Sequence, residues 1–125
     1  MSTIIVDTAA ELSAMLPDVV RTVVDPELLQ EAPTAAALRV LATIRDDRWQ
    51  PFVHPFAINW PALLDWARGT YRRHDSVLVR LEIAASLAGY PGAQVSLWYA
   101  ARALDDSNYL GMLDALRIAR DGVTS

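Results

Sequence analysis

Apolar side chains recur at three- and four-residue intervals along most of this chain, and this spacing constrains its fold more than any other feature. Such spacing places apolar groups on one face of a helix. Clear examples are the sets Leu12, Met15, Leu16, Val19, Val20, Val23 and Val24; Ala37, Val40, Leu41 and Ile44; and Leu63, Leu64, Ala67 and Tyr71. The sequence therefore predicts an all-α protein, a compact orthogonal or irregular helical bundle of about five to seven helices, in a single domain over residues 1–125.

Short polar side chains mark the expected helix starts. Thr8 and Glu11 form a capping-box pattern, and Asp25 precedes Pro26 at the start of a short helix that ends near Glu31. The other expected caps are Thr34 for a helix over 35–45, Asn59 for a helix that Arg72 and Arg73 close, Asp75 or Ser76 for a helix that ends at Gly89, and the run 105–108 for a last helix that stops at Gly122. A further helical stretch covers 97–104.

Two readings remain open near the N-terminus. Pro17 interrupts the first apolar pattern, so either one helix kinks there or a first helix ends near Met15 and a second begins at the proline. The valine-rich run 19–24 is also good strand material, and it could pair with a short extended segment at residues 3–6. We prefer the helical reading.

The polar residues indicate which helix faces meet solvent. In the helix over 35–45, Arg39, Thr43 and Asp46 lie opposite the apolar face, so we expect them in solvent. In the last helix the expected inward residues are Tyr109, Met112, Leu113, Leu116 and Ala119, whereas Asp114, Arg117 and Arg120 form a solvated face. The helix over 76–89 has no single polar face, so it is predicted to pack on two sides.

The composition offers little for catalysis. The chain has no cysteine and no lysine, and its histidines are His54 and His74. Disulfides, thiolate chemistry and thiolate zinc sites are therefore excluded. The spacing of Asp46, Asp47, His54, His74 and Asp75 matches no metal-ligand pattern, and helix capping explains Asp105, Asp106, Ser107 and Asn108. We expect a non-enzymatic protein without metal or cofactor.

An aromatic segment supplies the leading functional hypothesis. Rigid rings bring large contact areas at little entropic cost, so they suit a partner-facing anchor as well as a core. The segment contains Trp49, Phe52, His54, Phe56 and Trp60. The hypothesis is a protein-protein interaction or regulatory module that uses these residues to bind another protein or a second copy of itself, and the alternative is that the rings fill the core.

Two other functions remain as alternatives. Ala85, Gly89, Val95 and Trp98 match the spacing of a helix-turn-helix over residues 76–104, whose DNA-contacting residues would be Gln94, Ser96, Tyr99 and Arg102. The formal net charge of −4 argues against nucleic acid as a partner, because phosphate contacts supply much of the affinity for DNA. The second alternative is a binder of a small apolar ligand, lined by Trp49, Phe52, Trp66 and Trp98.

No apolar stretch reaches the roughly 20 residues that a bilayer-spanning helix needs. The first residues also lack the basic and apolar regions of a secretory signal. We therefore expect a soluble, cytoplasmic protein with no membrane contact.

Overall fold

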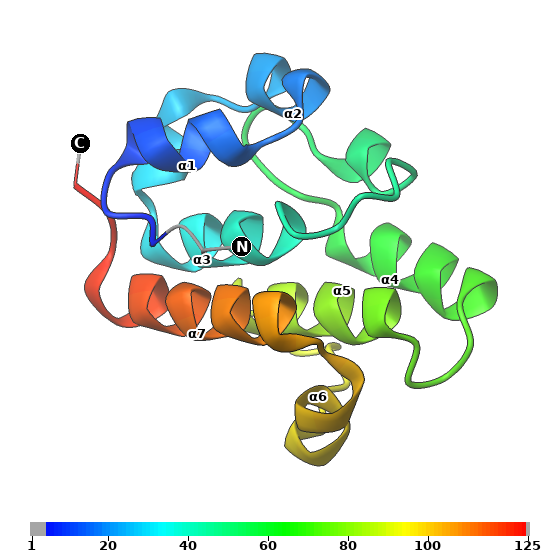
Figure 1. Ribbon diagram of the computed structural model, residues 1–125. Helices are drawn as coiled ribbons and strands as arrows, with labels where there is room; N and C mark the ends of the chain where they lie inside the picture. Colours follow the sequence, from blue (N-terminus) through cyan, green and yellow to red (C-terminus); the bar gives the residue numbers. More distant parts are fainter. Residues whose placement is uncertain (1–4, 125) are drawn as a thin grey trace.

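The computed structural model describes residues 5–124, and over this range the chain forms seven α-helices and two short 3₁₀-helices, with isolated bridges instead of β-strands (Figure 1). The helices are α1 (Ala9–Met15), α2 (Asp18–Val23), η1 (Pro26–Gln30), α3 (Ala32–Leu41), η2 (Gln50–Phe52), α4 (Trp60–Thr70), α5 (Ser76–Leu87), α6 (Leu97–Ala103) and α7 (Asp106–Asp121). The predicted all-α bundle is confirmed. No helix in the described part of the chain is long and apolar enough to cross a membrane.

Most of the expected caps are present. The Thr8 Oγ1 accepts from the Glu11 N–H, and the Glu11 carboxylate accepts from the Thr8 N–H, which completes the predicted capping box. Side chains of Asp25, Asn59, Asp75 and Asp105 accept from backbone N–H groups at the starts of η1, α4, α5 and α7. Gly122 ends α7 with a φ of 74°, a conformation that favours glycine.

Some predicted boundaries are wrong. Helix α3 begins at Ala32, not after Thr34, because Pro33 fits the first turn, where its missing N–H is not needed. It ends at Leu41, so Asp46 lies in the loop beyond it. Helix α4 ends at Thr70, and Arg72 and Arg73 follow it instead of closing it.

Pro17 separates two helices, and the valines of 19–24 are helical except for Val24, the C-cap of α2. The strand alternative for this run is therefore wrong, while residues 3 and 4 of its proposed partner lie outside the described range. The two ends of the chain are instead joined by a parallel bridge between Thr8 and Thr124, in which the Thr124 N–H donates to Asp7 O and the Ala9 N–H donates to Thr124 O.

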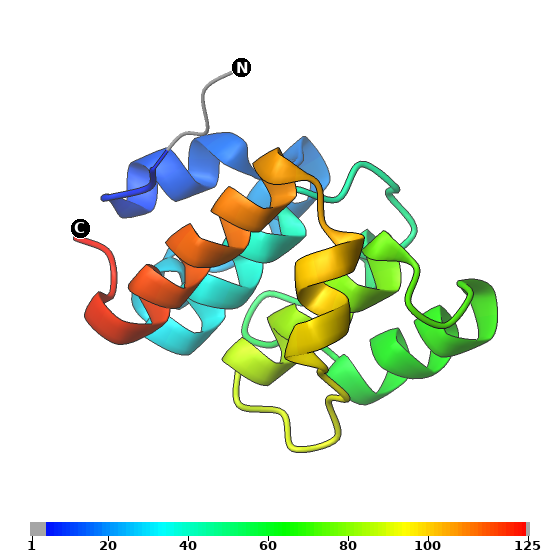
Figure 2. The same cartoon turned by 60° about the horizontal axis from the view of Figure 1, so that its bottom comes forward.

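Helix α3 occupies the centre of the bundle, with α7 along one side and α5 along another (Figure 2). All seven residues from Ala35 to Leu41 are buried. Three of them are alanines, so neighbouring helices approach closely. Helix α5 contacts α3, α4 and α6, which confirms the prediction that it packs on more than one side.

A buried ion pair joins α3 to α7. Arg39 Nε donates to Asp114 Oδ2 at 2.7 Å, and both side chains are at most 3% exposed. The same carboxylate accepts from the Val6 N–H at 3.1 Å and from Arg117 Nε at 3.2 Å, and Arg117 also donates to the carbonyl of Val6. The predictions that Arg39 and Asp114 lie in solvent are therefore wrong, because each provides the other with a buried partner of opposite charge.

Gly111 makes room for this ion pair. A Cβ at this position would lie 3.0 Å from Thr43 Cγ2 and 3.3 Å from Arg39 Nη1, closer than neighbours normally approach. The glycine therefore lets the guanidinium of Arg39 cross beneath α7, and the helix turns its Gly111–Asp114 side towards α3.

Candidate functional site

The residues of the predicted aromatic segment do not share one surface. Trp49 is 1% exposed and Trp60 is 8% exposed, so both belong to the core. Phe52 is partly buried against Trp66, with ring centroids 5.8 Å apart. Among the five residues proposed as a binding face, the exposed ones are His54 and Phe56, and Phe56 is 74% exposed. The core alternative describes Trp49 and Trp60 correctly.

An arginine-aromatic cluster lies next to this segment. The guanidinium of Arg48 is 5.5 Å from the ring centroid of Trp66 and 5.7 Å from that of Tyr71. Arg48 Nη2 donates to Asp46 Oδ2 at 2.7 Å, and the Tyr71 hydroxyl donates to the same oxygen. These hydrogen bonds, first of all the one from Arg48, hold the pKa of Asp46 well below its usual range, whereas burial and the bond to Asp46 raise the pKa of Tyr71.

The low pKa of Asp46 predicts a pH-dependent contribution to stability. The carboxylate is ionised more easily in the folded than in the unfolded chain, so its contribution is present above about pH 4 and is lost as the pH falls towards the folded pKa. Asp46→Asn removes this contribution. Because the Asp46 and Arg48 side chains are 23% and 56% exposed, we expect an effect of about 1 kcal/mol or less.

The measurement is urea unfolding of both proteins across the acid range. The difference in unfolding free energy should be constant near neutral pH and should shrink below about pH 4. Salt at about 1 M should also reduce it, since exposed pairs are screened. A difference that does not change with pH would contradict the assignment.

The residues of the predicted helix-turn-helix do not adopt that geometry. Nine residues, 88–96, separate α5 from α6, whereas the DNA-binding unit uses a turn of about three or four. Val95 and Trp98 should pack inwards in such a unit, but they are 40% and 61% exposed. The DNA-binding hypothesis therefore loses the structural motif on which it rested.

The residues proposed to contact DNA have local structural contacts. The Gln94 N–H donates to Glu82, and Ser96 caps α6 by accepting from the Tyr99 N–H. The ring of Tyr99 stacks on His74 with centroids 3.3 Å apart, and the guanidinium of Arg102 lies 4.7 Å from the ring centroid of Trp98.

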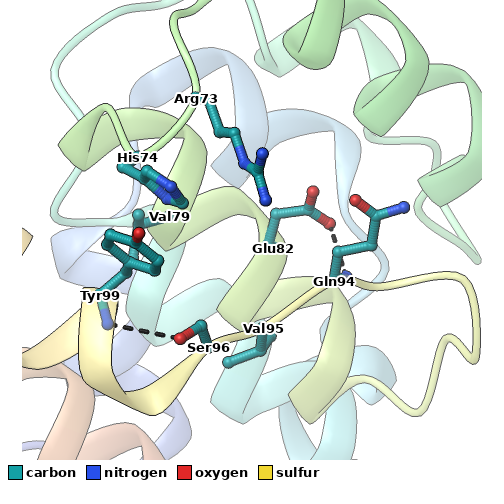
Figure 3. Close-up of a pocket in the computed structure, with 8 residues that line it drawn as sticks. All are labelled: Arg73, His74, Val79, Glu82, Gln94, Val95, Ser96 and Tyr99. Carbon is teal, nitrogen blue, oxygen red and sulfur yellow. Dashed lines mark hydrogen bonds between the residues drawn. The ribbon is translucent and has the colours of Figure 1, made fainter.

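A small cleft of about 250 Å³ lies between α5 and α6 (Figure 3). Its lining residues are Arg73, His74, Val79, Glu82, Gln94, Val95, Ser96 and Tyr99. Glu82 lies at its base and accepts from Arg68 Nε and Nη2 at 2.9 and 2.8 Å, which raises the pKa of Arg68. Arg68 also donates to the Gly92 carbonyl, so this ion pair holds the 88–96 loop against α5.

Most residues that line the cleft are polar or charged, and they are not those of the predicted apolar ligand site. None of Trp49, Phe52, Trp66 and Trp98 lines it. Trp49 is enclosed in the core, while Trp98 contacts Tyr99 and Arg102 on its own helix. The structure therefore does not assemble these four rings into one pocket.

Among the helices of the described residues, α7 carries on its outer face the largest number of exposed large apolar side chains. Eleven large apolar side chains are exposed in residues 5–124, and four of them lie on α7. Tyr109, Leu110, Leu113 and Leu116 are 40–48% exposed, although Tyr109, Leu113 and Leu116 were predicted to face inwards. The residues of α7 that are buried are Gly111, Asp114, Ala115 and Ile118.

A groove of about 350 Å³ runs beside this face. It is lined by Leu110, Leu113, Asp114 and Arg117, and by Ile5 from the N-terminal segment. Four helical residues at positions i, i+3, i+4 and i+7 form the kind of hole that receives one side chain of a facing helix. We call Tyr109, Leu110, Leu113 and Leu116, together with this groove, the α7 face.

Sequence periodicity alone could not select this face. Helix α7 carries a second set of small and apolar residues, Gly111, Ala115 and Ile118, at the same four- and three-residue spacing as Tyr109, Leu113 and Leu116. One residue that indicates this orientation of α7 is Asp114. Its carboxylate lies on the same side of the helix as Gly111, where it pairs with the buried Arg39 of α3.

No protein-family model, curated protein or solved structure matches this chain.

Proposed function

We propose that this protein is a non-enzymatic interaction module that binds another protein through the α7 face. The supporting observation is the orientation of α7, which places three leucines and a tyrosine in water while it buries an aspartate. Full burial of one leucine contributes about 1.5–3 kcal/mol, so covering several half-exposed ones gives a partner a substantial driving force. A contiguous exposed apolar surface with a charged edge is typical of a protein interaction site.

The surroundings of the face support a specific partner. Arg117 lines the groove and contacts Asp114, while Arg120 and Asp121 pair at the end of the helix. An apolar centre with charged groups around it resembles the core and rim of a protein interface. The bound element should be a helix, because the groove has the spacing of a knob-into-hole contact.

Leu113→Glu tests this proposal. Leu113 is 41% exposed, so the substitution should lower the stability of the fold by about 1–2 kcal/mol, and circular dichroism checks that the variant is folded. A charge at the centre of the face should weaken partner binding by at least tenfold, because it would have to be desolvated in the interface. The measurement is quantitative recovery of partners by the tagged protein from its own cells, after nuclease treatment.

The matched control is Val19→Glu, which adds the same charge at a 59% exposed apolar residue of α2. Partners recovered equally by Leu113→Glu and wild type would refute the proposal. Loss of all partners on nuclease treatment would instead favour the nucleic-acid alternative.

A further inference from the structure

We propose that the partner of the α7 face is a second copy of this chain, with the two α7 helices packed antiparallel about a two-fold axis at Leu113. This inference rests on the proposed function of the α7 face. It is supported by the order of residues along the helix. When a second α7 runs in the opposite direction, leucines of one copy face leucines of the other, and Asp106 faces Arg120.

The three leucines of α7 are placed symmetrically about Leu113, while Tyr109 lies at the level of Arg117 of the other copy. In an antiparallel pair with its axis at Leu113, each residue lies at the level of the residue equally far on the other side. Leu110 of one copy therefore meets Leu116 of the other, and the two Leu113 side chains meet at the centre. Each copy also presents the groove beside Leu113, which gives a side chain of the opposite helix room to pack.

Two charged residues near the ends of the helix, Asp106 and Arg120, follow the same symmetry, whereas Asp105 and Asp121 would bring like charges to the same level at the edge of the pair. Asp106 and Arg120 are each seven residues from Leu113, so each lies about 10 Å from it along the helix axis. Both are exposed, and the Arg120 side chain is 79% exposed. An antiparallel pair brings Asp106 of each copy opposite Arg120 of the other, whereas a parallel pair would oppose like charges at both ends. The Asp106–Arg120 pairing therefore favours the antiparallel arrangement, in which Arg120 shares its charge between Asp106 of the other copy and Asp121 of its own.

The size of the face sets the strength of this association. A stable protein interface usually buries about 800 Å² on each partner, and one helix face with a neighbouring groove supplies less. We expect a dimer in rapid exchange with monomer at micromolar concentrations or above. A two-fold contact closes on itself, so the association should stop at the dimer.

Charge reversal tests the register. Asp106→Arg and Arg120→Asp each create two repulsive contacts in the dimer, and each should raise the Kd for self-association by about tenfold or more. The double variant restores opposite charges in reversed order and should return the Kd to within about threefold of wild type. Sedimentation equilibrium of the purified full chain over a range of concentrations measures all four constants.

The double variant is a demanding test because it weakens the helix itself. Asp106 lies in the first turn and Arg120 in the last turn of α7, where each complements the helix dipole. Reversal of both removes both contributions, so recovered dimerisation cannot come from a more stable helix. Asp65→Arg changes the net charge as Asp106→Arg does, on the exposed side of α4, and should leave the Kd unchanged. Circular dichroism confirms that each variant is folded.

The outcomes separate this inference from the proposed function. A wild-type chain that stays monomeric at about millimolar concentration, or single reversals that behave like Asp65→Arg, would overturn the second copy as partner. If Leu113→Glu nevertheless loses a cellular protein, the α7 face remains a docking surface with a different occupant. A dimer unaffected by Leu113→Glu, together with unchanged cellular partners, would refute both.

Discussion

Asp114→Ala is expected to lower the free energy of unfolding by about 3–5 kcal/mol, the cost of removing one partner from a buried ion pair. The Asp114 carboxylate accepts from Arg39, Arg117 and the Val6 N–H, so it joins α7 to α3 and to the N-terminal segment. Its loss leaves the 2% exposed Arg39 without this counter-charge. Urea unfolding followed by circular dichroism measures the change.

Asp121→Ala is the matched control, because it removes an aspartate that pairs with an arginine at the exposed end of the same helix. Its effect should stay within about 0.5 kcal/mol. The double variant Arg39→Met and Asp114→Leu should recover at least half of the loss, since apolar residues of similar volume often replace buried ion pairs without penalty. Equal effects of Asp114→Ala and Asp121→Ala would show that the buried pair does not stabilise the fold.

Trp49→Ala is expected to destabilise the protein by about 3–5 kcal/mol through loss of packing and formation of a cavity. Trp49 is among the largest fully buried side chains of the described chain. Its Nε1 has no hydrogen-bond partner among the described residues, so the contribution of this ring comes from packing. Thermal unfolding should show a large drop in Tm.

Phe56→Ala removes an aromatic ring of the same segment that is 74% exposed, and it should change stability by no more than about 0.5 kcal/mol. This comparison decides between the two roles considered for the aromatic segment. If Trp49→Ala kept wild-type stability and lost only partner binding, the assignment of Trp49 to the core would be wrong.

Local sequence determined where most helices begin. A cap acts on backbone groups two or three residues away, so Thr8, Asp25 and Asn59 were predicted correctly without any tertiary information, and the alternatives left open for α5 and α7 included the observed caps Asp75 and Asp105. The error at Thr34 has the same local origin, because Pro33 already marked a start one turn earlier. The all-α fold follows from the same short-range patterns.

Which side of a helix is buried depends, in contrast, on groups far away in the chain. The aromatic segment shows this, since spacing could not tell that Trp49 and Trp60 reach the core while Phe56 stays in water. Those ring positions depend on where η2 and α4 lie against the bundle.

Helix α7 shows the division most clearly. Its sequence alone determines a helix from the Asp105 cap to Gly122, with apolar groups on two sides. The tertiary structure then decided between those sides, because Arg39, 75 residues away, needed a carboxylate inside the core and Gly111 allowed close approach. Loss of this buried counter-charge would cost about 3–5 kcal/mol, which is comparable with leaving three leucines half exposed, and Asp114 inside the core also accepts from Arg117 and the Val6 N–H.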